Sequence, residues 1–227
     1  MIGINSELAE RQKAGKPVKV GLIGAGQMGV DVVAQVTQMK GIEVVAIADI
    51  EIERAKAAYE IAGAKGQTKQ ADSAQQADRL VTQAALVYAS DYRVITDMSG
   101  IDVMLESTGV PEIGARAALR SARNGRHLAM MNVETDITVG PLLHRYAAHK
   151  NVLYALAAGD EPAACKELYD FADALGFTIV AMGKGKNNPL DRHAKPTDEK
   201  WAAEAAKKGG SAGFRVPSLK GRDFFVG

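Results

Sequence analysis

The sequence predicts an α/β protein, a doubly wound parallel sheet followed by the start of a second α/β domain. Short apolar segments alternate with helical patterns through the first 158 residues, which is typical of strands joined by crossover helices. The segment Ile42–Ala48 is apolar except for Glu43, as expected where helices cover both faces of a sheet. This regular alternation weakens after Gly183. We therefore expect a first domain over residues 1–158 and a partial second domain over residues 159–227.

The first half of the chain predicts a lead-in helix and then strands that alternate with helices. By residue range, the expected elements are a helix at 5–14, a strand at 18–23, a helix at 27–40, a strand at 42–48, helices at 52–62 and 73–84, and a strand at 86–88. Gly15 and Pro17 end the lead-in helix before the first strand. Residues 92–98 mix Val and Ile with polar residues and predict no definite element.

The second half continues the alternation into the next domain. The expected elements are a strand at 103–106, a helix at 111–124, a strand at 127–131, a helix at 137–149, a strand at 152–158, a helix at 160–174 and a strand at 177–182. Right-handed crossovers place the helices on both faces of the sheet and leave the carboxyl ends of the strands as the ligand crevice.

Composition narrows the class of protein. The formal net charge is +1, from 28 basic and 27 acidic residues, which argues against a polyanion partner such as nucleic acid. The apolar runs fall short of the roughly 20 residues that a membrane helix needs, and the N-terminus lacks a secretory pattern. Because Cys165 is the one cysteine, an internal disulfide is excluded. We expect Cys165 to be a small buried residue. We expect a cytoplasmic homo-oligomer whose partner is a small-molecule substrate.

A glycine-rich turn follows the first predicted strand. It reads Gly24-Ala25-Gly26-Gln27-Met28-Gly29, and it opens a predicted helix. In this pattern the first glycine allows the tight turn, the second lets the backbone approach a pyrophosphate, and the third allows close helix packing. The alternative is a turn with no ligand. We expect the six residues to bind NAD or NADP, in a Rossmann-type dinucleotide-binding domain.

An acidic residue ends the second predicted strand. Asp49 lies 20 residues after Gly29, where a carboxylate can accept hydrogen bonds from the adenosine ribose hydroxyls of NAD. The alternative is an ordinary polar residue at a strand end. Arg54 lies nearby and could take the 2′-phosphate of NADP. The choice between the two cofactors stays open at this point.

Polar residues follow the two strands predicted at 103–106 and 127–131. Thr108, Gly109, Asn132 and Glu134 lie at the edge where the nicotinamide half of a dinucleotide would bind, so they are candidate cofactor contacts. The alternative is that Thr108, and Thr135 or Asp136, cap the helices that follow, an interpretation we favour for Asp136.

A basic loop follows the last predicted strand. It reads Gly183-Lys184-Gly185-Lys186-Asn187-Asn188-Pro189. A lysine can neutralise an anionic substrate or donate a proton when burial or a like-charged neighbour lowers its pKa. Lys184, Lys186 and Asn188 are therefore the candidate catalytic residues, and a solvated basic turn is the alternative.

A divalent metal is a further option. Glu134, Asp160 and Glu161 could supply oxygen ligands of the kind that Mg²⁺ or Mn²⁺ prefers, although Asp160 also suits a helix cap. The four histidines show no ligand spacing. The metal residues themselves are left unassigned.

These motifs together resemble the homoserine dehydrogenase-like oxidoreductases, and within them the branch of 1-deoxy-D-xylulose 5-phosphate reductoisomerase-like proteins. The resemblance covers roughly residues 8–204. The segments that carry it are Ala14-Gly15-Lys16-Pro17, Val20–Gly26, Glu106–Glu112, Met131–Glu134, Ala158–Pro162 and Gly183–Pro189. The last two are the most specific.

The resemblance implies an NAD(P)-dependent oxidoreductase acting on a small polar, phosphorylated metabolite. In the reductoisomerase-like branch this is the NADPH-dependent conversion of 1-deoxy-D-xylulose 5-phosphate, a step of isoprenoid biosynthesis that uses a divalent metal. It also implies a catalytic domain and a SAF-type domain, which we expect to be shortened here because residues 208–227 match no family pattern. The alternatives are a nucleotide-binding module without turnover and an epimerase with tightly bound NAD.

Overall fold

The computed structural model describes residues 4–157 and 161–183, with the backbone alone for 161–163. The chain divides into two compact units, residues 1–155 and 156–227. No helix among the described residues is long and apolar enough to cross a membrane.

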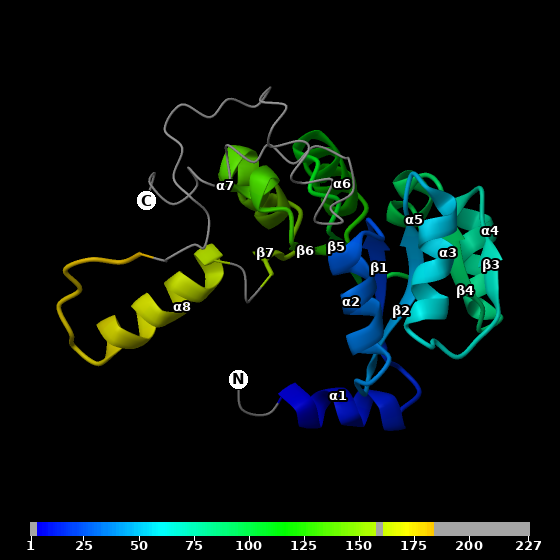
Figure 1. Ribbon diagram of the computed structural model, residues 1–227, viewed down its shortest axis with the longest axis horizontal. Coiled ribbons are helices and arrows are strands. Elements are labelled where there is room, and N and C mark those ends of the chain that lie inside the picture. Colours follow the sequence, from blue (N-terminus) through cyan, green and yellow to red (C-terminus); the bar gives the residue numbers. More distant parts are fainter. Residues whose placement is uncertain (1–3, 158–160, 184–227) are drawn as a thin grey trace, which may run out of the picture. The chain divides into compact units, whose positions relative to one another are not determined.

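The first unit is built on a seven-stranded sheet, and Figure 1 labels its strands in the order β3-β4-β2-β1-β5-β6-β7. The registered pairs β1–β2, β1–β5, β2–β4, β3–β4 and β5–β6 are all parallel. The strands are β1 (Val18–Ile23), β2 (Ile42–Ala48), β3 (Thr68–Gln70), β4 (Leu86–Ala89), β5 (Val103–Glu106), β6 (His127–Met130) and β7 (Tyr154–Leu156). This is the predicted doubly wound parallel sheet.

The helices pack in two sets. They are α1 (Ile4–Lys13), α2 (Gln27–Val36), α3 (Ile52–Ile61), α4 (Ala74–Thr82), α5 (Tyr92–Thr96), α6 (Pro111–Arg123) and α7 (Val133–His149), with α8 (Glu161–Ala174) in the second unit. Helix α2 contacts α3, whereas α4, α5, α6 and α7 contact one another in succession. With right-handed crossovers this order puts the two sets on opposite faces. The chain changes face between β1 and β5, which is the topological switch point.

Some expected elements differ from the observed ones. The strand β3 and the short helix α5 were not predicted, and α2 ends at Val36 rather than at residue 40. The predicted strand at 177–182 is wrong, because these residues form no regular structure and are mostly exposed. A strand needs a hydrogen-bonded neighbour, and the sheet ends at β7. Cys165 is partly exposed rather than buried.

Helix α7 begins at Val133, four residues before its predicted start. Its N-cap is Asn132, whose side-chain oxygen accepts a hydrogen bond from the Thr135 N–H (3.0 Å). The prediction that Asp136 caps this helix is therefore wrong. The carboxylate of Asp136 instead accepts a hydrogen bond from the Tyr154 hydroxyl (2.8 Å).

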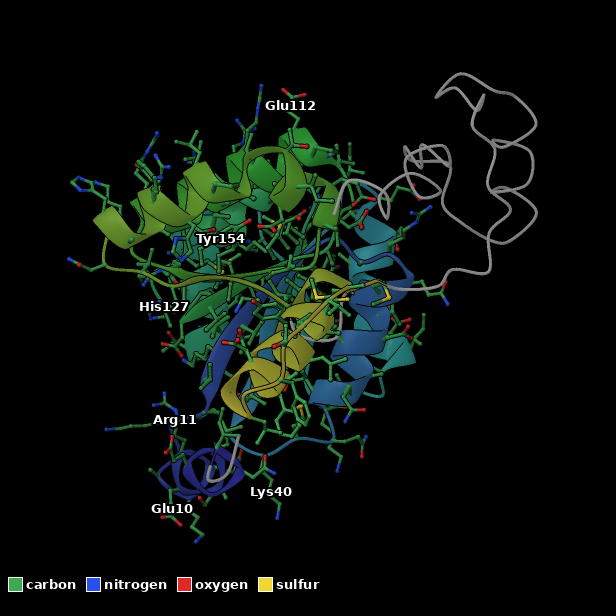
Figure 2. The ribbon with its side chains drawn as sticks, turned by 90° about the vertical axis from the view of Figure 1, so that its left-hand side faces the viewer. Glu10, Arg11, Lys40, Glu112, His127 and Tyr154 are labelled. Carbon is green, nitrogen blue, oxygen red and sulfur yellow. The ribbon has the colours of Figure 1, made fainter. Side chains whose placement is uncertain are left out.

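The main core lies between the sheet and the helices α2 and α3. Leu22, Val33 and Ile47 are fully enclosed there, and the buried Tyr59 hydroxyl donates to the Val87 carbonyl (3.2 Å). Helix α1 is attached at the start of β2 through Gln12, whose side-chain oxygen accepts from the Gly41 N–H (2.8 Å). Figure 2 shows Glu10 and Arg11 of α1 near Lys40, at this end of the sheet.

An ion pair links α5 to α6, and we expect its contribution to the stability of the protein to be lost in acid. Arg120 donates to both carboxylate oxygens of Asp97, and the Asn124 amide donates to the same carboxylate (2.8 Å). The Arg120 side chain lowers the pKa of Asp97 below 3.8. The stability from this pair is therefore present above pH 3.8 and lost as the pH falls through the lowered pKa of Asp97.

We expect Asp97→Asn to lower the free energy of unfolding at pH 7 by about 1 kcal/mol, because the pair is partly exposed to solvent. Urea denaturation of both proteins between pH 7 and pH 3 checks this. The difference between them should shrink in acid, and a loss that is constant over this range would show that the charge contributes nothing.

Candidate functional site

The carboxyl ends of β4, β2, β1, β5 and β6 meet along one edge of the sheet. The registered partners at that edge are Ala89, Ala48, Ile23, Glu106 and Met130. Backbone hydrogen bonds extend the alignment one residue further: Gly24 donates to Ala48 (2.8 Å), Ser107 to Ile23 (2.8 Å) and Met131 to Glu106 (2.8 Å). The glycine turn, Asp49 and the turns after β5 and β6 therefore share one edge, as the sequence predicts.

The three motif glycines occupy different environments. Gly24 has a φ of +95°, and a Cβ there would lie 2.9 Å from the Ser107 carbonyl carbon. A Cβ at Gly29 would lie 2.2 Å from the Gly24 carbonyl oxygen. A Cβ at Gly26 would meet no atom of the described residues within 4 Å. Gly24 and Gly29 are thus required by close packing, whereas the space above Gly26 is open.

The open glycine begins helix α2. Gly26 is the N-cap, and no side chain caps this end of the helix. The first N–H groups of the helix are therefore free to bind an anion, and the helix dipole favours negative charge at the same place. Gln27 and Met28 are exposed beside it, whereas Ala25 is buried.

Asp49 joins the glycine turn to the end of β2. One carboxylate oxygen accepts from the Ala25 N–H (2.7 Å) and the other from the Glu51 N–H (2.8 Å). Each oxygen keeps acceptor capacity for a further donor. Arg54 forms an ion pair with Glu51 (2.9 Å) and does not pair with Asp49.

The turn from β5 to α6 packs against the glycine turn. The Ser107 hydroxyl donates to the Gly24 carbonyl (2.9 Å), and the Thr108 hydroxyl accepts from the Val110 N–H (3.2 Å). Thr108 therefore shapes the turn just before α6, whose N-cap is Val110. Thr108 and Gly109 are both partly exposed at this edge.

The last residue of β5 is a buried carboxylate. Glu106 is 0% exposed, and one of its oxygens accepts from both the N–H (3.0 Å) and the hydroxyl of Thr108. Burial raises the pKa of Glu106, and the hydrogen bonds from Thr108, with the nearby Asn132 amide, oppose that rise. Charge repulsion from Glu134 adds to the increase.

The start of α7 contributes two of the predicted contact residues. Asn132 is buried (1% exposed). Its side chain caps α7 and does not line the surface of the crevice. Glu134 is partly exposed in the first turn of α7. Tyr154 lies on the sheet side of α7 (Figure 2), and burial, with its bond to Asp136, raises its hydroxyl pKa so that it stays protonated.

The predicted catalytic residues, Lys184, Lys186 and Asn188, lie outside the described residues. Asp160 also lies outside them, and only the backbone of Glu161 is described. Within the described part of the chain, no group of three or more His, Cys, Asp or Glu side chains could hold a metal ion.

The sequence interpretation missed three residues of this edge. Glu106 was placed in a motif but given no role, and the contacts of Ser107 and Glu51 were not foreseen. A carboxylate that ends the apolar strand Val103–Glu106 was a usable signal, because a buried charge requires partners.

Comparison with known proteins adds one family match. A protein-family model described as "Oxidoreductase DRL, catalytic domain" matches residues 159–216. This range contains Gly183–Pro189 and all of Ala158–Pro162 except Ala158, the two segments that carry the most specific part of the resemblance. No curated protein matches the chain.

Solved structures match about 70% of the chain. The WlbA dehydrogenase of Bordetella pertussis, in complex with NADH and UDP-GlcNAcA, is 17% identical, with a TM-score of 0.50 over 70% of this chain and 42% of that one. An NAD binding oxidoreductase from Klebsiella pneumoniae is 17% identical, with a TM-score of 0.49 over 70% and 39%. The scyllo-inositol dehydrogenase of Lactobacillus casei is 14% identical, with a TM-score of 0.48 over 70% and 42%.

The chain spans about two fifths of the length of these structures, and at such identities the likeness establishes the fold alone. The comparisons support the oxidoreductase part of the resemblance. They do not support homoserine dehydrogenase, the reductoisomerase or isoprenoid biosynthesis in particular. The chain has the α/β fold of a Rossmann-type dinucleotide-binding domain, followed by a segment similar to an oxidoreductase catalytic domain.

Proposed function

We propose that this chain binds NAD at the carboxyl edge of its sheet and belongs to an oxidoreductase that acts on a small polar substrate. One observation carries the proposal. Between two glycines that packing requires, Gly26 leaves open space at an uncapped helix N-terminus. Among the residues that the structure describes, no contact demands a glycine at that position, and a bound pyrophosphate would demand one.

The adenosine half of the dinucleotide would lie over β2. The Asp49 carboxylate, oriented by two backbone N–H groups, would accept the ribose hydroxyls. A 2′-phosphate would instead meet the negative charges of Asp49 and Glu51, and Glu51 already engages Arg54. This arrangement favours NAD over NADP.

The nicotinamide half would lie over β5 and β6, the second mononucleotide half of the sheet. Thr108, Gly109 and Glu134 are partly exposed there and would orient it, and Asn132 would support them from beneath. The dinucleotide supplies hydride transfer, and the contribution of the protein is to bind and orient it.

The segment that matches the DRL catalytic domain would bind the substrate. Two lysines and an amide, Lys184, Lys186 and Asn188, suit a phosphate or carboxylate group. Sugar phosphates, including 1-deoxy-D-xylulose 5-phosphate, and polar alcohols or aldehydes such as homoserine and its aldehyde are the classes to screen. Each is tested with and without Mg²⁺ by following NADH absorbance. Dinucleotide binding with no turnover on any class would favour a nucleotide-binding module, and nucleotide that copurifies with the protein would favour the epimerase alternative.

The cofactor preference gives a testable prediction. We expect Asp49→Ala to weaken NADH binding about tenfold and NADPH binding less, because two ribose hydrogen bonds are lost while repulsion of the phosphate is relieved. Fluorescence titration with both nucleotides measures the ratio.

Glu51→Gln is the matched control, since it retains the backbone N–H that orients Asp49 and releases Arg54 from its ion pair. NADPH affinity should rise about threefold in this variant, and NADH affinity should stay unchanged. Equal losses of both nucleotides in Asp49→Ala would mean that Asp49 only maintains the turn.

A further inference from the structure

Two buried polar atoms lie beside the same glycine of α6, near the ends of β5 and β6. In the part of the chain that the structure describes, Glu106 Oε2 and Asn132 Nδ2 are the buried side-chain polar atoms without a hydrogen-bond partner. Both lie beside Gly114 of α6, where a Cβ would be 3.1 Å from Glu106 Oε2 and 3.0 Å from Asn132 Nδ2. Polar atoms enclosed to this degree pair directly or through one water, because leaving both unpaired is costly.

The other hydrogen bonds of the two side chains determine which atom is the donor and which is the acceptor. The Asn132 oxygen accepts the Thr135 N–H as the cap of α7, so the amide nitrogen is the atom directed at Gly114. The other oxygen of Glu106 accepts both donors of Thr108, so its free oxygen is directed at the same point. A donor therefore faces an acceptor.

The buried pair is connected to the crevice through Thr108. Glu106 binds both the N–H and the hydroxyl of Thr108, and the Thr108 hydroxyl in turn accepts the Val110 N–H. The same turn lies against Gly24, at the switch point between the two mononucleotide halves. Any displacement of the Glu106 carboxylate would move this turn on the nicotinamide side.

We propose that Glu106 and Asn132 form an acceptor–donor pair across Gly114 that positions the Thr108–Gly109 turn for the nicotinamide half of the dinucleotide. Glu106 is fully enclosed and acts through Thr108, so it is a positioning residue. The inference rests on the proposed function, because it assigns a task within the same dinucleotide site.

Reversing the polarity of the pair tests the proposal. In Glu106→Gln, the new side-chain amide has two possible orientations. One directs its NH₂ at the NH₂ of Asn132 and the other directs it at the donors of Thr108, so a donor meets a donor in both. In Asn132→Asp, the helix cap is retained, because aspartate is a good N-cap, but two carboxylates face each other. The double variant Glu106→Gln/Asn132→Asp restores one donor and one acceptor with their places exchanged.

The readout compares NADH with ADP-ribose, which keeps the adenosine, the pyrophosphate and the second ribose and lacks only the nicotinamide ring. We expect each single variant to weaken NADH binding about tenfold and ADP-ribose binding by less than about threefold. A loss of this size corresponds to one buried hydrogen-bonding group left without a suitable partner. The double variant should return NADH affinity to within about threefold of wild type. If the pair had only a structural role, the single variants would lower the affinities for NADH and ADP-ribose equally.

Two results would overturn the proposal: a double variant whose NADH loss equals or exceeds the combined losses of the single variants, or equal losses of NADH and ADP-ribose. If Glu106→Gln does not fold, Asn132→Asp is compared with the double variant, which should bind NADH more tightly. Wild-type protein that binds neither ligand would reject the proposed function instead. The pairing itself would then be judged by thermal unfolding, where both single variants should melt below the double variant.

Discussion

Gly26→Val should abolish dinucleotide binding, with a loss of at least about 100-fold in NADH affinity, and leave the fold intact. The substitution places a branched side chain in the only space at this turn that the protein leaves unfilled, among the described residues. The backbone tolerates it, because the φ of Gly26 is −70° with an extended ψ of −172°. Calorimetric titration with NADH measures the loss, and circular dichroism with thermal unfolding reports on the fold.

Gly26→Ala gives a graded companion to this substitution, and its smaller side chain should reduce affinity by less. Unchanged NADH affinity in a folded Gly26→Val protein would mean that no ligand approaches the turn here. A protein that fails to fold would contradict the open space above Gly26.

Gly29→Ala should have the largest effect on stability, a loss of about 3 kcal/mol or more in the free energy of unfolding. Its Cβ would lie 2.2 Å from the Gly24 carbonyl oxygen, an atom of the backbone that cannot turn away. Relief would require α2 to move away from β1, which would disturb the buried contacts of Val33 with the sheet. Urea denaturation measures the change.

Gly26→Ala is the matched control, because it adds the same methyl group three residues earlier in the same turn. It should change the free energy of unfolding by less than about 1 kcal/mol, the usual range for a glycine to alanine change at a helix N-cap. Similar stabilities of the two variants would contradict the close packing of Gly29 on Gly24.

The parts of the fold that could be predicted are those with a local physical cause. The bounds of β1, β2 and β5 were predicted residue for residue, since predominantly apolar runs end there at glycine or charged residues. The dinucleotide motif was placed correctly after a strand and before a helix for the same reason.

The parts that could not be predicted depend on contacts between distant residues. Strand β3 is the polar tripeptide Thr68–Gln70, and only pairing with β4 makes it a strand. The early start of α7 depends on whether Asn132 or Asp136 provides the cap, and both residues suit that role. Glu106 and Asn132, which lie at or just after the ends of two strands, both lie beside Gly114 of α6, a relation that no local pattern records.

Titration of NADH into the wild-type full chain tests the central claim most directly. Saturable binding of one NADH per chain, with a dissociation constant in the micromolar range and competition by ADP-ribose, is the expected result. Binding that is absent at millimolar NADH, or that survives unchanged in Gly26→Val, would contradict the account.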